Sequence, residues 1–499
     1  MGLVQKTIPS NPFSPVVCGR CSRIEERLSA VPGLFAYFVL AAYVPLSALA
    51  FFLMRPAKAA MFVVLVGILF LPGLVCFDAP LIPPLGKHEV ATVCALLGLL
   101  ISSPRKLRHA RLGRGGDAFL LLTIPAIAFT VFTNRDPLTF GPLVLPGLTM
   151  HDLLSSIVRF FFEAAVPYLV GRLVVTSSRD ACTLVRTFVW LGLAYSLLML
   201  FEMRFSPNLH RWIYRYHYYA DFSQTLRWGG YRPTVFLEHG LAVGLFALAA
   251  AILAATEGRI ARLRFGLPTG WSTLYLVTVL ILCKSTGAII LGLVTLPVVA
   301  FASPRRQVRV ALLLAAVCIA YPSVKLAGLF PDQAIVELAR SHLNAERADS
   351  LQFRFDNDKR LMDKAREQLW FGWGGFGRNR LYDDAGRDTA VTDGYWIIVL
   401  GSGGLVQLVC SFGLLLYPVI RVARVLRRVR EPRDRFLLAG LAVALVCYVF
   451  DLLPNGMYNP IPLFLAGALT RLNLELSRLE MTEPLVVRTG SEVGIQFRE

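Results

Sequence analysis

Long apolar runs recur along this chain, and they limit the folds that it can adopt. A bilayer core of roughly 30 Å is crossed by a helix of about 20 apolar residues. Because the runs are continuously apolar rather than alternating, an outer-membrane β-barrel is excluded. The sequence therefore predicts an all-α, polytopic membrane protein with about 12 or 13 transmembrane helices. The runs lie at 33–54, 59–76, 88–102, 117–133, 152–173, 182–202, 234–255, 269–283, 286–303, 308–329, 395–420, 435–454 and 457–472.

The composition supports this interpretation. Of the 499 residues, 55% are hydrophobic and 17% are charged, whereas soluble domains carry about 25% charged residues. The net charge of +18 comes largely from short linkers between apolar runs. Clustered Lys and Arg in short loops mark the cytoplasmic side of a membrane protein, so we expect a lipid bilayer and no nucleic acid as partner. These basic linkers are 105–114, 258–264, 304–309 and 421–435.

The position of these linkers sets the expected organisation. A tail at 1–32 precedes transmembrane helices over 33–329, which carry an outward loop at 203–233. A large extracytoplasmic loop over 330–394 and further transmembrane helices over 395–472 follow. The last segment, 473–499, is expected to be a polar cytoplasmic tail.

The polar interruption at 331–393 holds ten Lys/Arg and twelve Asp/Glu residues. Its first part, 332–370, contains neither Pro nor Gly and has helical periodicity, which predicts one or two amphipathic helices over the outer mouth of the bundle. Arginines recur at six- and seven-residue steps, so several share one face. That row is either a solvated face or a basic face aimed at a pyrophosphate. Its members are Arg347, Arg354, Arg360 and Arg366.

The outward loop at 203–233 is rich in aromatic and guanidinium side chains. Aromatic faces stack on sugar rings, and guanidinium groups bind phosphate oxygens in pairs. Tyr and Trp also gather at membrane interfaces, so a sugar contact and an interfacial belt both remain open. The aromatic residues are Trp212, Tyr214, Tyr216, Tyr218, Tyr219, Phe222, Trp228 and Tyr231.

Arg232 lies at the start of the predicted helix 234–255, beside Pro233. His239 follows seven residues later, on the same face if the helix has begun, and Glu238 precedes it. Ionisable groups within a span normally face a polar cavity. We therefore predict an anionic headgroup site at Arg232 with acid/base groups below it. The alternative is an internal ion pair of Glu238 and a bundle hydrogen bond of His239.

Lys284 interrupts another apolar run at its outward end, followed by Ser285, Thr286 and Gly287. Helix N-termini present free N–H groups to anions, and a lysine adds positive charge. A phosphate contact and a simple tight turn are both open for Lys284.

Glycines and aromatic residues alternate over 370–380, where backbone could approach a ligand or another helix closely. Asp393 then stands at the mouth of the span 395–420, where a carboxylate could act as a base towards a bound sugar. Cys18 and Cys21 form a single Cys-x-x-Cys with no second pair and no nearby His, so no zinc site is expected.

The order Arg232-Pro233, DSLQFR (349–354), FGWGGFGR (371–378), DGYW (393–396) and Gly401-x-x-Gly404 resembles the O-antigen ligase and polymerase superfamily, in particular its exopolysaccharide polymerases. The resemblance covers about residues 190–455. It implies metal-independent inverting glycosyl transfer, without a cofactor, at the outer face of a bacterial inner membrane. The implied donor is an oligosaccharide on undecaprenyl pyrophosphate, and other polysaccharide assembly proteins are expected as partners.

The resemblance also implies roles for individual residues. Arg232 corresponds to the family's helix-start arginine, Arg354 supplies a second phosphate contact, and Arg347 is a further candidate. Asp393, or its neighbour, occupies a position where ligases and many polymerases have His. We therefore favour Asp393 as the base and keep His239 as the reserve. The remaining expected substrate contacts are Lys284, Trp373, Arg378 and Tyr395.

Other functions remain possible. A ligase would use the same donor with a different acceptor. A metal-dependent glycosyltransferase would need acidic residues in the first outward loop, here the short turn near 78–87, where only Asp78 is present. A lipid-oligosaccharide transporter would hold its charges near the bilayer midplane, often within internal repeats, whereas here they lie in the outward loops.

Overall fold

The computed structural model describes residues 32–79, 82–105, 113–218, 222–261, 263–264, 267–342 and 345–489. Cys18, Cys21 and Tyr219 lie outside these ranges. Each apolar run predicted above contains a helix. In an apolar environment the backbone groups must be paired within the segment, and a helix does this. The long helices are α2 (Leu34–Leu53), α3 (Pro56–Phe70), α4 (Lys87–Ser102), α6 (Asp117–Phe132), α9 (Ser178–Phe205), α11 (Gly240–Ile260), α12 (Thr269–Leu282), α13 (Thr286–Phe301), α14 (Pro304–Leu326), α17 (Tyr395–Val425), α18 (Pro432–Asp451) and α19 (Ile461–Thr489).

One further span is a composite of three pieces. α7 (Met150–Phe160) runs through the π-helical turn η1 (Phe161–Ala165) into α8 (Val166–Val174). With this composite, six helices within the described residues are long and apolar enough to cross a membrane, and four shorter helices are also apolar. The described chain is thus an α-helical bundle with the composition of a membrane protein.

Strands are confined to four short antiparallel hairpins within the described residues. Each closes a connection between helices rather than forming a layer of its own. They are β1 (Phe77–Ala79) with β2 (Ile82–Leu85), β3 (Leu138–Phe140) with β4 (Leu143–Leu145), β5 (Leu226–Arg227) with β6 (Gly230–Tyr231), and β7 (Leu263–Arg264) with β8 (Leu267–Pro268).

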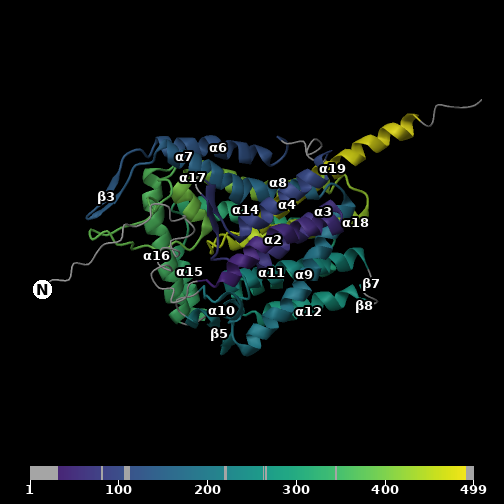
Figure 1. Ribbon diagram of the computed structural model, residues 1–499, viewed down its shortest axis with the longest axis horizontal. Helices are drawn as coiled ribbons and strands as arrows, with labels where there is room; N and C mark the ends of the chain where they lie inside the picture. The colour runs from purple at the N-terminus through teal and green to yellow at the C-terminus, as the bar shows by residue number, and fades with distance from the viewer. Residues whose placement is uncertain are drawn as a thin grey trace, which may run out of the picture.

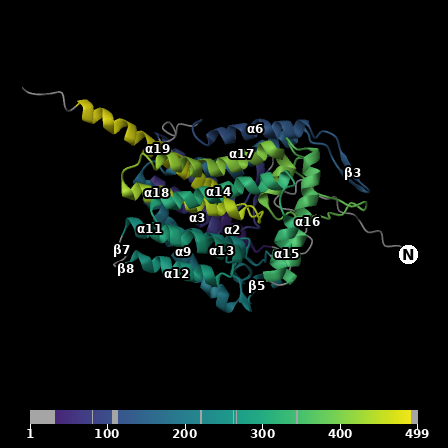
Figure 2. The same cartoon turned by 180° about the vertical axis from the view of Figure 1, so that it is seen from behind.

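The two ends of the bundle differ. The predicted amphipathic segment forms two helices, α15 (Asp332–His342) and α16 (Ala345–Glu367), and α16 lies across one end of the bundle (Figure 1). We call this the capped end. The last turns of α19 and the β7–β8 hairpin lie at the other end, which the view from behind also shows (Figure 2).

The basic linkers gather at the end opposite the cap. Arg259 at the end of α11 donates to the Ala300 carbonyl at 2.6 Å and lies 4.6 Å from the centre of the Phe436 ring. These contacts bring together the end of α11, the end of α13 and the start of α18. Three of the four basic linkers therefore adjoin one another, and the fourth lies partly outside the described residues.

Helix α11 begins later than predicted. The structure starts it at Gly240, so the expected helical start at 234 is wrong, and His239 and Arg232 do not share a helix face. Val235 has a φ of +49°, and the amides of Thr234 and Val235 donate to the Glu202 carboxylate at 2.8 and 2.7 Å. These bonds stabilise an irregular segment at 232–239 in place of the first helical turns.

Helix α17 is broken at Gly404, which has a φ of +70° and a ψ of −170°. The segment that leaves α16 pairs with the backbone at this break. Trp373 and Gly374 donate to the Gly401 and Ser402 carbonyls at 2.9 and 2.8 Å, while Leu405 donates to Leu369 at 2.8 Å. The glycine-rich motif therefore packs against a helix, one of the two uses predicted for it.

The helix of the last predicted span does not end at 472 but continues into the segment predicted as a tail, as far as Thr489. Asn473 and Ser477 are buried, and the Asn473 amide donates to the Pro418 carbonyl at 2.9 Å. Arg471 pairs with Glu475 at 2.7 Å one turn on, so polar residues extend α19 through side-chain pairs.

Candidate functional site

Arg354 and Asp393, from two separate motifs, meet at the capped end. The Arg354 Nε lies 3.4 Å from Asp393 Oδ2, and the two side chains are 45% and 26% exposed. Arg354 stands in the middle of α16, and Asp393 stands two residues before α17. A guanidinium and a carboxylate thus form an ion pair that solvent reaches.

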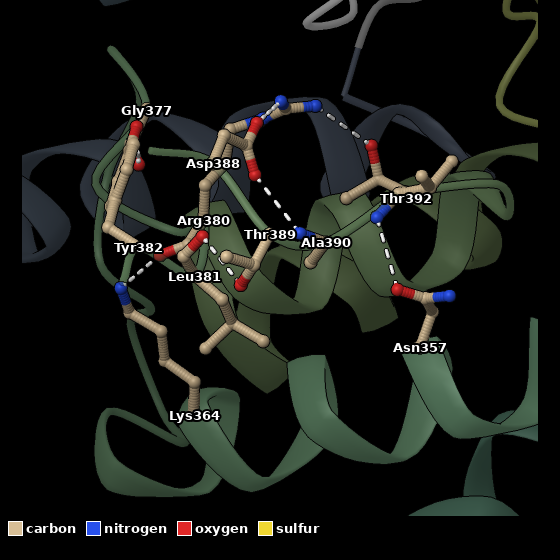
Figure 3. Close-up of polar contacts among 11 residues, drawn as sticks. Asn357, Lys364, Gly377, Arg380, Leu381, Tyr382, Asp388, Thr389, Ala390 and Thr392 are labelled. Atoms are coloured by element: carbon tan, nitrogen blue, oxygen red, sulfur yellow. Dashed lines mark hydrogen bonds and ion pairs between the residues drawn. The ribbon is translucent and has the colours of Figure 1, made fainter. Parts of the chain in front are cut away.

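The loop that precedes Asp393 is held on α16, and Figure 3 shows its contacts with Asn357 and Lys364. The Val391 amide donates to Asn357 Oδ1 at 3.2 Å, and Lys364 Nζ donates to the Arg380 carbonyl. Within the loop, Arg380 pairs with Asp388. Because Asn357 lies three residues after Arg354, the same helix face holds the loop and the ion pair.

Asp358 is a buried carboxylate on this face, 8% exposed and one turn after Arg354. Burial, with Asp393 and Asp332 adding to it, raises the pKa of Asp358 to about 6, although Lys325 and Arg354 oppose the rise. Several charged groups therefore converge beneath the Arg354–Asp393 pair.

Lys325 anchors this cluster from the end of α14. Its side chain is 2% exposed, pairs with Asp332 and lies 4.1 Å from the centre of the Phe355 ring and 4.6 Å from that of Phe330. A desolvated cation between aromatic faces and a carboxylate holds α14, α15 and α16 together.

Arg232 lies deeper at the same end. Its side chain is 4% exposed, and its NH2 group donates to Ser285 Oγ at 3.1 Å. A Cβ on Gly240 would come within 2.7 Å of its Nε, so the guanidinium packs against the first turn of α11. Asp451, at the end of α18, is within electrostatic range of Arg232.

The end of α18 connects Arg232 with Asp393. Asp451 accepts a hydrogen bond from Asn455 at 3.0 Å, and the Leu452 carbonyl accepts one from the Tyr395 amide at 2.9 Å. A Cβ on Gly456 would lie 3.1 Å from the Asp393 carbonyl. The residues after α18 therefore adjoin Asp393, and Asp451 at the end of α18 relates them to Arg232.

His239 caps α11 rather than projecting from its side. Its Nδ1 accepts a hydrogen bond from the Leu241 amide at 3.0 Å, and the residue is 9% exposed. When Nδ1 accepts, a neutral imidazole carries its proton on Nε2. In that tautomer Nε2 carries the proton and donates. His239 is therefore better suited to capping α11 and to donating a hydrogen bond than to acting as a base.

Glu238, beside His239, faces cations from α4. It lies 3.4 Å from Lys87 Nζ and 3.8 Å from His88 Nε2, while its side chain is 46% exposed. Burial within the surrounding protein opposes its ionisation, yet Lys87 and His88 together lower the pKa of Glu238 below its ordinary value. Glu238 is thus an accessible carboxylate whose ionised form Lys87 and His88 favour.

Tyr395 lines another part of the capped end. It stacks on Tyr458 with ring centres 4.9 Å apart and 8° between the planes. Glu163 in η1 is exposed and lies within electrostatic range of both tyrosines and of Arg159. A charged residue within a span faces protein or water rather than lipid, and π-helical turns are frequent at functional sites.

Two other predicted contacts, Arg378 and Trp373, have structural partners. Arg378 is 2% exposed and donates to the carbonyls of Trp373, Pro146 and Asp136 at 3.2, 2.8 and 3.0 Å. Trp373 Nε1 donates to the Lys364 carbonyl at 2.9 Å. We therefore leave Arg378 and Trp373 out of the proposed site, because their polar groups serve the loop.

Lys284 has a φ of +54°, and its amide donates to the Ile281 carbonyl at 3.1 Å. A Cβ on Gly230 would lie 2.2 Å from its Nζ, so the side chain covers the β5–β6 hairpin. This geometry favours the tight-turn interpretation over a phosphate contact. The side chain of Arg347 lies outside the part of the chain that the structure describes.

The aromatic loop divides into two groups. Tyr214, Tyr216 and Tyr218 are 4%, 0% and 9% exposed and cluster with His210 and Phe236. Neither an interfacial belt nor a sugar platform describes these three, because their rings fill the interior. Trp212, Trp228 and Phe222 stay exposed, so both interpretations remain open for them.

A scan against models of known protein families found no match, and a search of the curated proteins found none either. Among the described residues, no group of three or more His, Cys, Asp or Glu side chains is arranged to hold a metal ion.

Sequence reasoning missed several residues that shape the site. Glu202 was overlooked although it is a lone acid in an apolar run, and it accepts from the amides of Leu209, Thr234 and Val235. Lys87 and Asp358 were also missed. A charged residue inside or at the edge of an apolar run was the available signal for Glu202 and Lys87.

Proposed function

We propose that this chain is a membrane glycosyltransferase. In this proposal it joins undecaprenyl-pyrophosphate-linked oligosaccharide repeats into a polysaccharide, with the capped end facing the periplasm of a bacterial inner membrane. The observation that carries the proposal is the Arg354–Asp393 pair, 3.4 Å apart and solvent-accessible. It unites a phosphate-binding group and a candidate base from the two motifs that resemble the superfamily.

The reaction assigns one task to each group. The Asp393 carboxylate takes the proton of an acceptor hydroxyl, whose oxygen forms a bond to the anomeric carbon of the donor sugar. The bond from that carbon to the pyrophosphate oxygen breaks, and its electron pair leaves with the phosphate. Attack from the opposite face inverts the anomeric centre. Positive charge near the leaving oxygen stabilises the transition state.

Arg354 is the accessible arginine of the site, because its side chain is 45% exposed while its Nε faces Asp393. Arg232 is buried against Ser285 and the start of α11, where the N–H groups of the first helical turn add positive potential. We assign Arg354 to direct phosphate contact and Arg232 to the deeper positive potential around it.

The basic linkers support the proposed orientation. Three of them meet at the end opposite the cap, as the contacts of Arg259 show. Under the positive-inside rule that end faces the cytoplasm. The capped end then faces outward, where lipid-linked repeats would be joined.

The proposal is tested with purified protein in proteoliposomes that contain a lipid-linked oligosaccharide repeat. We expect a ladder of products spaced by one repeat, and loss of the ladder in Arg232→Ala and Arg354→Ala with normal membrane levels. A ladder formed without a lipopolysaccharide core favours a polymerase over a ligase. Movement of the lipid across the bilayer without any transfer would reject the enzyme proposal in favour of a transporter.

A further inference from the structure

Asp358 is the one buried carboxylate of the α16 cluster that the proposed reaction does not use. It is 8% exposed and lies one helical turn after Arg354. Charged or titratable groups face it from every element packed against it. They are Lys325 and Tyr321 from α14, Asp332 from α15, Arg354 from α16, and Asp393 from the loop before α17.

Lys325 is the cation that acts most strongly on Asp358, and it is also engaged with other groups. Lys325 pairs with Asp332, and its ammonium group lies over the rings of Phe330 and Phe355. Arg354 is the other cation of the cluster, and its Nε faces Asp393 at 3.4 Å. Because Arg354 precedes Asp358 by one helical turn and its Nε faces Asp393, one guanidinium neighbours both carboxylates.

We propose that Asp358 is a positioning residue whose charge decides how strongly Arg354 holds Asp393. When Asp358 is ionised, Arg354 is attracted by both carboxylates and holds Asp393 less strongly. Asp393 can then accept a proton from the acceptor hydroxyl. When Asp358 is neutral, Arg354 is held by Asp393 alone, and that attraction opposes proton transfer to Asp393. This inference rests on the proposed function and adds a regulatory residue to the same site.

The change would occur in a physiological range. Burial, together with the charges of Asp393 and Asp332, raises the pKa of Asp358 to about 6. An unperturbed aspartate titrates near 3.9, far below the range in which most enzymes operate. Asp358 is therefore placed to switch its charge when the outer compartment becomes mildly acidic.

The test uses the full-length protein in proteoliposomes with a lipid-linked oligosaccharide repeat, assayed from about pH 5 to about pH 8. For the wild type we expect kcat to fall as the pH drops through about 6, with little change in KM. For Asp358→Asn we expect that inflection to disappear and kcat at pH 7.5 to be about tenfold lower, again with KM unchanged.

Asp363→Asn is the matched control. Asp363 lies on the same helix, its side chain is 55% exposed, and it pairs with Arg366 at 2.6 Å, away from Asp393. We expect it to keep the wild-type pH profile. An Asp358→Asn profile that keeps the wild-type inflection would overturn the inference and leave the proposed function intact. No transfer by the wild type at any pH would instead remove the proposed function.

A second measurement does not require activity. The infrared band of a protonated carboxyl should titrate near pH 6 in the wild type, be missing in Asp358→Asn, and move to higher pH in Arg354→Ala. The last shift follows because a cation that favours ionisation has been removed. A band that does not respond to Arg354→Ala would show that the two groups are not coupled, which overturns the inference.

Discussion

Arg354 Nε lies 3.4 Å from Asp393 Oδ2. This contact joins the middle of α16 to the segment just before α17. The two residues are separated by a loop whose own hydrogen bonds, to Asn357 and Lys364, determine where Asp393 lies. The pair is thus a product of the loop fold and not of proximity in sequence.

Asp393→Asn should lower glycosyl transfer by at least about 100-fold, because an amide cannot take the hydroxyl proton. Product ladders from the proteoliposome assay give the measurement. Arg340→Ala is a suitable control, since Arg340 is 59% exposed and pairs only with Asp349 among the ion pairs described. Wild-type product from Asp393→Asn would remove Asp393 as the base.

His239→Ala should reduce stability more than it reduces chemistry. The His239 Nδ1 caps α11 by accepting from the Leu241 amide, and loss of an N-cap costs about 1 kcal/mol. We expect a lower apparent melting temperature in detergent with measurable transfer retained. If His239→Ala is inactive at an unchanged melting temperature while Asp393→Asn is active, the base is His239.

Asp358→Asn should stabilise the protein at neutral pH. Because folding raises the pKa of Asp358 from 3.8 to about 6, the folded state holds a proton that the unfolded state releases over that interval. Wild-type stability therefore falls as the pH rises from about 4 to about 6, by on the order of 1–3 kcal/mol. Thermal unfolding should show Asp358→Asn more stable at pH 7.5, with the advantage shrinking towards pH 4. An equal advantage at both pH values would contradict this.

Gly404→Ala should disrupt the break in α17. A Cβ there would lie 2.3 Å from the Trp370 carbonyl carbon, and the φ of +70° disfavours any side chain. We expect a loss of about 3 kcal/mol or more, seen as reduced yield and a lower melting temperature. Gly287→Ala in α13 is the control, because its Cβ would meet nothing within 4 Å. Equal behaviour of the two variants would rule out the proposed packing role of Gly404.

Chelation should leave transfer unchanged. The proposed reaction neutralises the leaving phosphate with Arg354 and Arg232 and assigns no step to a metal ion. Assays with an excess of a divalent-ion chelator, compared with assays supplemented with Mg²⁺ or Mn²⁺, provide the measurement. Activity that needs a divalent ion would point to the metal-dependent class of lipid-linked glycosyltransferases instead.

The helices were predictable from sequence, because continuous apolar runs report burial in lipid or in the bundle directly. The irregular entry to α11 was not, since it depends on Glu202, which lies more than 30 residues earlier and accepts its amide hydrogens at 2.8 and 2.7 Å. Arg354 and Asp393 were recognised as separate candidates, but their pairing depends on the fold of the loop. Arg378 had a plausible charge for a ligand contact, and only its three carbonyl partners reveal its role in that loop.

The backbone bonds between residues 369–374 and the break in α17 have a consequence for access. They fasten the end of the α15–α16 segment to α17, while Lys325 fastens its beginning to α14. Because both of its ends are held, the α15–α16 segment is a fixed cover and not a hinged lid. If the chain acts on a lipid-linked substrate as proposed, that substrate would therefore approach Asp393 from the side of the bundle rather than through a gap opened by movement of α16.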